Sequence, residues 1–180
     1  MFYDTIGPAF IPIAFATAAE ADPSAKLYYN DYNLEWPSAK VTAAQNIVKL
    51  IKQYGAKIDG VGMQAHFQLD RVPSYDAQVA AIKGYAALGV DVAYTELDIR
   101  VPVPANNSIY SLQADAYYNS TAACLTVDKC VGITVWDWTD KYSWVPEVFA
   151  GFGDALPWDK NFVKKPAYSA ILKAFQTFKP

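Results

Sequence analysis

The chain is poor in the residues that bind metals and in apolar runs long enough to cross a membrane. It has one histidine and two cysteines in 180 residues, which cannot build an ordinary zinc site, so the sequence predicts no metal. It also lacks a glycine-rich phosphate loop, and no cofactor is expected. No apolar stretch approaches the roughly 20 residues that span a bilayer, so we expect no membrane contact.

Positive charge is also scarce. The chain has 15 Lys and Arg against 18 Asp and Glu, a formal net charge of -3, and without a basic stripe no nucleic-acid partner is expected. Hydrophobic residues make up 53% of the chain, and aromatic residues make up 15%, with five Trp and thirteen Tyr. This composition predicts a single globular domain over residues 1–180 and favours a neutral ligand that can lie on aromatic rings.

The N-terminal stretch from Ala9 to Ala19 faintly imitates a signal peptide. However, Asp4 and no basic residue precede it, and Pro12 interrupts it, so we predict a kinked amphipathic helix instead. If the protein is secreted, we expect its targeting segment upstream of Met1 or already removed.

The two cysteines, Cys124 and Cys130, enclose five residues. As a disulfide this short ring would stabilise the fold by about 2 kcal/mol, and two reduced buried thiols are the alternative. Two N-glycosylation acceptor sequences begin at Asn106 and Asn119, which agrees with an oxidising secretory route. We therefore predict a secreted, extracellular protein.

A strand–helix rhythm runs along the chain. Strand-like apolar segments begin near Leu27, Ile58, Val90 and Val131. Apolar residues at helical spacing follow at Ala44, Ile47, Val48 and Ile51, at Val79, Ile82, Tyr85 and Ala86, and at Tyr168, Ile171, Leu172 and Phe175. Gly55 and Gly89 are expected helix stops, and Pro166 is an expected helix start. Four strands and about five helices predict an α/β fold of parallel strands with helices outside.

The most informative polar run stands at the end of the third predicted strand, Tyr94-Thr95-Glu96-Leu97-Asp98. Strict alternation places Tyr94, Glu96 and Asp98 on one face and the other two residues on the opposite face. Because parallel barrels collect their chemistry at the carboxyl ends of strands, this run predicts carboxylates aimed at a cavity. A solvated strand end is the alternative.

Polar or aromatic residues also end the other strands. Alternation predicts that Gln64 shares a face with His66 and that Trp136 shares a face with Trp138. His66 is the one histidine, and a lone histidine often has only a structural role. No serine is singled out by its sequence context as a nucleophile, so the sequence gives little support for a Ser-His-Asp triad. Together the strand ends favour a carboxylate mechanism.

Four stretches resemble the family 10 glycoside hydrolases, mostly retaining endo-β-1,4-xylanases. They are LYYNDYN at 27–33, DGVGMQAHF at 59–67, YTELDI at 94–99 and VWDWTDKYSW at 135–144. The resemblance covers nearly the whole chain and implies the C-terminal half, strands five to eight, of a (β/α)8 TIM barrel. It further implies a catalytic domain that hydrolyses xylan or xylooligosaccharides.

The resemblance also assigns roles to single residues. It implies that Glu96 is the catalytic nucleophile and that His66 and Asp98 support it. The residues implied to contact the sugar chain are Asn30, Gln64, Trp136 and Trp144. The Cys124 and Cys130 pair resembles a disulfide of fungal members.

One part of the family pattern is missing. The acid/base glutamate of the family follows an Asn, and no Asn-Glu dipeptide occurs in this chain. Four other carboxylates are expected near the rim formed by the strand ends, but nothing in their spacing marks any of them as the missing acid/base. They are Asp31, Glu35, Asp137 and Asp140. We therefore expect little xylanase activity from the isolated chain.

Half of a barrel would also leave two sheet edges without partner strands. Such open edges would favour aggregation, a dimer or an N-terminal half-barrel partner.

Two other classes of function stay open. In a non-catalytic carbohydrate-binding module, Trp136, Trp138 and Trp144 would stack on sugars and Glu96 would only hydrogen-bond. A structural remnant would bind no ligand. Among enzymes, a related β-glucan hydrolase shares the plan of two glutamates, but the stretches around His66 and Trp136 favour xylan.

Overall fold

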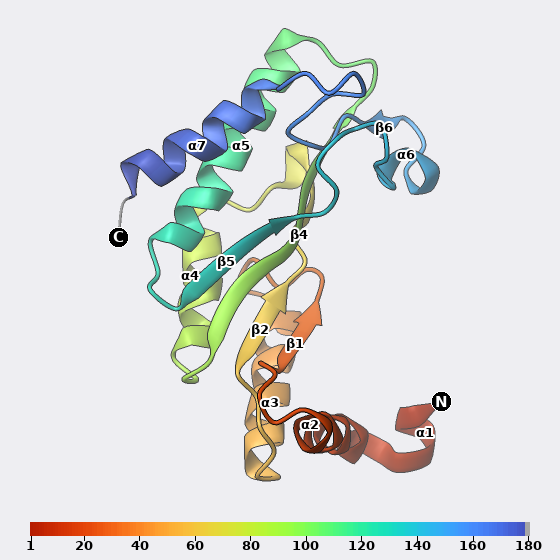
Figure 1. Ribbon diagram of the computed structural model, residues 1–180, viewed down its shortest axis with the longest axis vertical. Coiled ribbons are helices and arrows are strands. Elements are labelled where there is room, and N and C mark those ends of the chain that lie inside the picture. Colours follow the sequence, from red (N-terminus) through yellow and green to blue (C-terminus); the bar gives the residue numbers. More distant parts are fainter. Residues whose placement is uncertain (179–180) are drawn as a thin grey trace.

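The computed structural model describes residues 1–178, in which helices line one side of a mainly parallel sheet (Figure 1). The strands are β1 Tyr28–Asp31, β2 Gly60–Met63, β3 His66–Gln68, β4 Asp91–Pro102, β5 Cys130–Val135 and β6 Phe152–Gly153. The α-helices are α1 Phe2–Ile6, α2 Phe10–Ala21, α3 Ala39–Gln53, α4 Tyr75–Ala86, α5 Asn107–Leu125, α6 Val145–Val148 and α7 Pro166–Thr177. Two 3₁₀ turns are η1 Gly7–Ala9 and η2 Leu69–Arg71.

The four principal strands are parallel and lie in the order β1, β2, β4, β5. Each begins within two residues of its predicted start, and the helices α3, α4, α5 and α7 follow them in turn. The predicted architecture of parallel strands with helices outside is confirmed. The count of four strands was too low, because β3 and β6 are too short to show an alternating pattern.

Local signals position the helices that cover the sheet. The Ser38 side chain accepts a hydrogen bond from the Val41 backbone N–H and so caps α3, and Ser74 caps α4 in the same way. Gly55 and Gly89 follow these two helices with φ near +72° and +73°. Glycine adopts this left-handed backbone without strain, which explains why both helices end where predicted.

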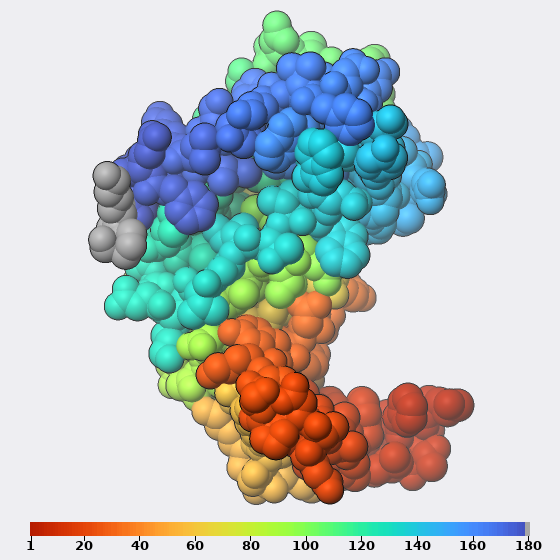
Figure 2. All heavy atoms as spheres, viewed as in Figure 1, coloured from red at the N-terminus to blue at the C-terminus, as the bar shows by residue number. Residues whose placement is uncertain are grey.

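The N-terminal helices differ from their prediction. Pro12 lies in the first turn of α2, where proline is tolerated, and does not kink it. The chain instead bends at η1, where Gly7 has φ of +72°. The amphipathic prediction was also wrong, because the apolar side chain of Ile13 stays exposed, at 49%, while α2 has no distinct buried face. Figures 1 and 2 show α1 and α2 projecting from the rest of the molecule.

The sheet has an open edge on each side within the described part of the chain. There β1 pairs only with β2, and β5 pairs only with β4. Val131 on β5 is an apolar residue with 57% of its surface exposed. These are the two open edges expected from the sequence, and their unpaired backbone groups can accept further strands.

A buried ion pair fixes the long connection between β5 and α7. Lys165, the residue before α7, places its Nζ 2.9 Å from an oxygen of Asp140, and both side chains are at most 6% exposed. The other Asp140 oxygen accepts a hydrogen bond from the Leu156 backbone N–H. A buried ion pair contributes little net stability, but this one orients the connection that follows β5.

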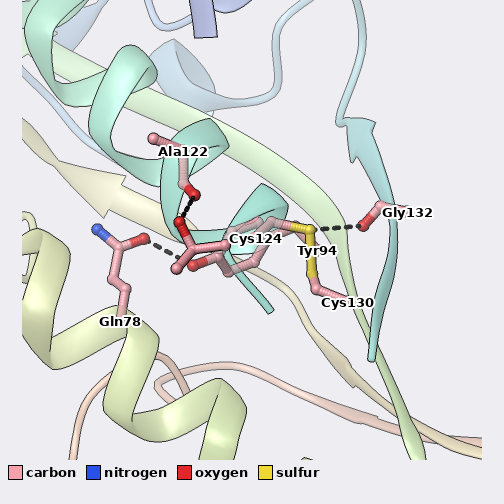
Figure 3. The surroundings of a disulfide bond; sticks show 7 residues. Gln78, Tyr94, Ala122, Cys124, Cys130 and Gly132 are labelled. Carbon is pink, nitrogen blue, oxygen red and sulfur yellow. Dashed lines mark hydrogen bonds between the residues drawn. A yellow bond between two sulfur atoms is a disulfide. The ribbon is translucent and has the colours of Figure 1, made fainter. Parts of the chain in front are cut away.

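A disulfide joins Cys124, at the end of α5, to Cys130, at the start of β5 (Figure 3). The two Cα atoms are 5.2 Å apart. This confirms the disulfide prediction over the alternative of two free thiols. None of the helices within residues 1–178 is long and apolar enough to cross a membrane.

Replacing both cysteines by serine should lower the free energy of unfolding by about 2 kcal/mol, because the unfolded chain regains the freedom of this short loop. Urea denaturation of the oxidised protein and of the double variant measures the difference. Ser111→Ala, at an exposed position of α5, is the control. Equal unfolding midpoints for the double variant and the wild type would show that the loop adds no constraint.

Candidate active site

The alternation of side chains between the two faces of β4 is interrupted in the middle of the strand. The Tyr94 hydroxyl donates a hydrogen bond to Gln78 of α4, so Tyr94 faces the helices. Leu97 also lies in the core, although three positions separate it from Tyr94. The pairing with β5 slips between these two residues, as it does at a β-bulge. The prediction that Tyr94 shares a face with Glu96 and Asp98 was therefore wrong.

The bulge leaves both carboxylates of β4 beside the ring of His66. The Nδ1 atom of His66 lies 2.7 Å from Asp98 Oδ2, and its Nε2 atom lies 3.0 Å from Glu96 Oε2. Both ring nitrogens can donate at once only when the imidazole is protonated. The geometry therefore suits an imidazolium between two carboxylates.

The pKa of His66 is raised above its ordinary value of 6.5 by this environment. Burial is the largest single influence and lowers the pKa, but the hydrogen bonds and charges of Asp98 and Glu96 together outweigh it. The side chain of His66 is 14% exposed, that of Glu96 is 16% exposed, and Asp98 is fully buried. Only Glu96 of the two carboxylates can therefore reach a ligand.

The second oxygen of Glu96 is held from β1. Asn30 Nδ2 donates a hydrogen bond of 3.0 Å to Glu96 Oε1, and Asn30 Oδ1 accepts one of 2.7 Å from the Thr95 hydroxyl. Gly62 on β2 makes room for this contact, since a Cβ atom there would lie 2.5 Å from Asn30 Oδ1. Each Glu96 oxygen thus has one hydrogen-bond partner.

A hollow of about 500 Å³ opens beside Glu96. Its lining residues are Tyr32, Asn33, Gln64, His66, Glu96, Arg100, Trp136, Trp144 and Phe149. Figure 2 shows that the molecule is concave between the N-terminal helices and the C-terminal segments. Among the lining residues Glu96 is the one carboxylate, and Tyr32, Trp136 and Trp144 carry aromatic rings on which a sugar could stack.

The structure brings together the site residues named from the sequence. Gln64, His66, Trp136 and Trp144 line the hollow, and Asn30 contacts Glu96. The Trp144 ring donates an Nε1–H hydrogen bond of 2.8 Å to Asp98 and packs edge-on against His66. Their roles toward a sugar remain predictions.

Trp138 does not share the position of Trp136. It stacks on Phe162 and packs edge-on against Trp158 instead of lining the hollow. Both tryptophans follow the end of β5, and Asp137 between them has φ of +65°. Strand alternation does not apply across such a residue, so the predicted shared face was wrong.

No role was assigned from the sequence to four lining residues. Tyr32 and Asn33 lie in the stretch 27–33 that resembles the family, whereas Arg100 and Phe149 were missed. Arg100 lies on β4 two residues after Asp98, and alternation could have identified it. Its guanidinium lies 3.9 Å from the ring centroid of Phe149 and donates a hydrogen bond to Gln68. Burial lowers the pKa of Arg100, although the negative charge of Asp98 acts to raise it.

The other acidic candidates lie outside the hollow. Asp31 pairs with Lys40, and Asp140 pairs with Lys165. Glu35 is buried and accepts a hydrogen bond from the Ala65 backbone N–H, while Asp137 is exposed and does not line the hollow. Within residues 1–178, no group of three or more His, Cys, Asp or Glu side chains is arranged to hold a metal ion.

The raised pKa of His66 predicts a pH-dependent contribution to stability. A group whose folded pKa lies above its unfolded value contributes fully below the unfolded pKa, and the contribution is lost as pH rises through the folded pKa. The wild type should therefore lose stability relative to His66→Gln as pH rises from below 6.5, by about 1.4 kcal/mol for each pH unit that separates the folded from the unfolded pKa. Urea unfolding of both proteins across pH 5 to 9 (roughly the range in which histidine titrates) measures this difference. A difference that does not change with pH would contradict it.

Comparison with known proteins places the chain in a family. The family model for glycosyl hydrolase family 10 matches residues 1–174. Endo-1,4-beta-xylanase D from Talaromyces funiculosus is 56% identical over 177 residues, which cover 98% of this chain and 44% of that protein. Endo-1,4-beta-xylanase B from Humicola insolens is 54% identical over 95% of this chain and 50% of that protein.

Solved structures agree with the sequence relatives. A family 10 xylanase from Bispora sp. MEY-1, crystallised with xylobiose, superposes with a TM-score of 0.92 at 43% identity over 97% of this chain and 55% of its own. The endo-1,4-beta-xylanase XylE of Penicillium canescens superposes with a TM-score of 0.94 at 41% identity over 98% of this chain and 55% of its own. The chain spans about half the length of these relatives, and its fold is half of their TIM barrel. The chain belongs to glycosyl hydrolase family 10.

Proposed function

We propose that this chain supplies the nucleophile side of a retaining endo-β-1,4-xylanase and that Glu96 is the nucleophile. The observation that carries the proposal is the position of Glu96, which is the one carboxylate lining the hollow. Asn30 and His66 hold its two oxygens. A carboxylate oriented in this way can attack an anomeric carbon with little reorganisation.

In the proposed reaction, a Glu96 oxygen forms a bond to the anomeric carbon while the bond to the leaving sugar oxygen breaks. A second carboxyl group protonates that oxygen. Water then attacks the glycosyl-enzyme ester, gives a proton to the second carboxylate and releases Glu96. Asn30 and His66 hold the two Glu96 oxygens in place through both steps.

The residues that line the hollow include no second carboxyl group. In retaining hydrolases the two carboxyl groups lie about 5 to 5.5 Å apart with both facing the sugar. Asp98 is near Glu96 but is fully buried and bonded to His66 and Trp144. We therefore propose that the acid/base comes from residues outside this chain, on an N-terminal half-barrel that pairs with the open edges of β1 and β5.

Xylan or a xylooligosaccharide is the substrate that the lining favours. Trp136 and Trp144 offer ring surfaces, and Gln64 offers an amide donor and acceptor for sugar hydroxyls. Asn30, beside Glu96, keeps a second Nδ2–H that a hydroxyl could accept. The names of the relatives and the xylobiose in one related structure support this choice. The disulfide supports an extracellular location, because disulfides persist in oxidising compartments.

A second candidate is sugar binding without hydrolysis by the isolated chain. The observation that favours it is the same absence of a second carboxylate from the lining within residues 1–178. A self-associated form through the open edges would behave in the same way unless it brought in another carboxyl group.

The isolated chain should release almost no reducing sugar from xylan. Mixed with a separately expressed N-terminal segment of a homologous family 10 enzyme that carries its acid/base glutamate, it should become active. Glu96→Gln should then reduce kcat by roughly 10³-fold or more, because the ester cannot form. Reducing-sugar release from xylan measures both effects.

Glu20→Gln is the matched control, since Glu20 is an exposed carboxylate on α2 that does not line the hollow. It should leave the activity of the mixture unchanged. Full activity of the isolated chain, or of the Glu96→Gln mixture, would overturn the proposed assignment. Tight binding of xylohexaose by a mixture that never turns over would favour the binding function instead.

A further inference from the structure

Glu35 is a buried carboxylate that the proposed mechanism does not use. It follows β1 in the chain, is 1% exposed and does not line the hollow. One of its oxygens accepts a hydrogen bond of 2.7 Å from the backbone N–H of Ala65. Because burying a carboxylate is costly, its burial at this position calls for a role.

The partner of Glu35 is a strained residue between two residues of the site. Ala65 separates Gln64 from His66, is fully buried and has φ of +62°. Residues with a Cβ atom rarely adopt this left-handed backbone, which the surroundings must hold in place. Here the chain turns out of β2 and into β3, so the turn decides where the His66 ring points.

The peptide groups at Ala65 are held on both sides. The carbonyl of Ala65 accepts a hydrogen bond of 3.2 Å from the Asp98 backbone N–H, and its N–H donates to Glu35. The next residue, His66, pairs with Asp98 in the β3–β4 register. A backbone turn that relaxed at Ala65 would therefore move the His66 ring away from both carboxylates.

We propose that Glu35 is a positioning residue that holds the left-handed turn at Ala65 and so keeps His66 between Glu96 and Asp98. This deepens the proposed function, because it assigns the residue that sets the geometry of the nucleophile's partner. A charged acceptor suits the task, since hydrogen bonds to an ionised group are about twice as strong as neutral ones. Burial raises the pKa of Glu35 above its ordinary value, although the backbone N–H groups of Ala65, Glu35 and Leu34 and the charge of His66 all oppose it.

The chain has one histidine, so His66 can be followed alone by NMR after labelling with ¹⁵N-histidine. Two substitutions separate the hydrogen bond from the charge. Glu35→Gln removes the charge but keeps an oxygen that can accept from Ala65, whereas Glu35→Met has similar length and no such acceptor. Glu35→Met combined with Ala65→Gly removes the strain as well, because glycine adopts positive φ freely.

The His66 pKa should be lower in Glu35→Met than in Glu35→Gln by about 1 unit, since the ring loses its ordered contacts with two carboxylates. The combined Glu35→Met and Ala65→Gly variant should recover most of that difference. Asp59→Asn is the control, because Asp59 accepts a backbone hydrogen bond from Leu27 at the opposite end of the strands. It should leave the His66 pKa unchanged.

Equal His66 pKa values in Glu35→Gln and Glu35→Met would overturn the proposal, because charge alone would then explain any change. If Glu35→Met does not fold by circular dichroism, folding of its combination with Ala65→Gly supports the proposal. Failure of both to fold while Glu35→Gln folds would assign Glu35 to general stability and overturn it. None of these measurements needs hydrolysis, so the outcome is independent of the proposed xylanase activity.

Discussion

Burial of the Asp98 carboxylate is the constraint on which the rest of the site depends. An ionised carboxylate without exposed surface requires donors or an opposite charge. His66 and Trp144 provide them, with hydrogen bonds of 2.7 and 2.8 Å to the same oxygen. The first turns the other ring nitrogen of His66 toward Glu96, and the second places an indole at the wall of the hollow. One buried carboxyl group thus positions a second carboxylate and an aromatic ring that face a ligand.

The outer side of β4 makes that inner arrangement rigid. Tyr94, Leu97 and Ile99 are fully buried in the core on this side, and their packing leaves little freedom for the strand. The bulge between Tyr94 and Leu97 lets the strand keep this packing while two carboxylates face inward. Asn30 and Thr95 then connect β1 to β4 across the glycine at position 62. A site assembled on three neighbouring strands is held more firmly than one on loops.

The same sheet explains why half of an active site can be well formed in half of a barrel. Every contact to Glu96 and Asp98 described above comes from β1, from the β2–β3 turn and the start of β3, or from the connection after β5. The buried Lys165–Asp140 pair ties the connection between β5 and α7 to the start of α7. What the described residues do not provide is a second carboxylate facing the hollow, and the open edges of β1 and β5 are where further strands could bring one.

Local signals in the sequence were enough to place the parallel strands, the helices that follow them and their ends at Gly55 and Gly89. These features depend on residue periodicity and on backbone freedom within a few residues, which a sequence displays directly. The resemblance to a known family then identified Glu96, His66 and Asp98 as residues that belong together, and the structure places them in contact.

Tertiary structure alone decided the direction of several side chains. The bulge in β4 turned Tyr94 away from the carboxylates, and the left-handed residue Asp137 separated Trp138 from Trp136. Such departures from regular geometry are stabilised by contacts between distant segments, so no local pattern reveals them. The sequence by itself therefore determined which elements form and which residues gather at the strand ends, and long-range packing determined which of those residues face the hollow.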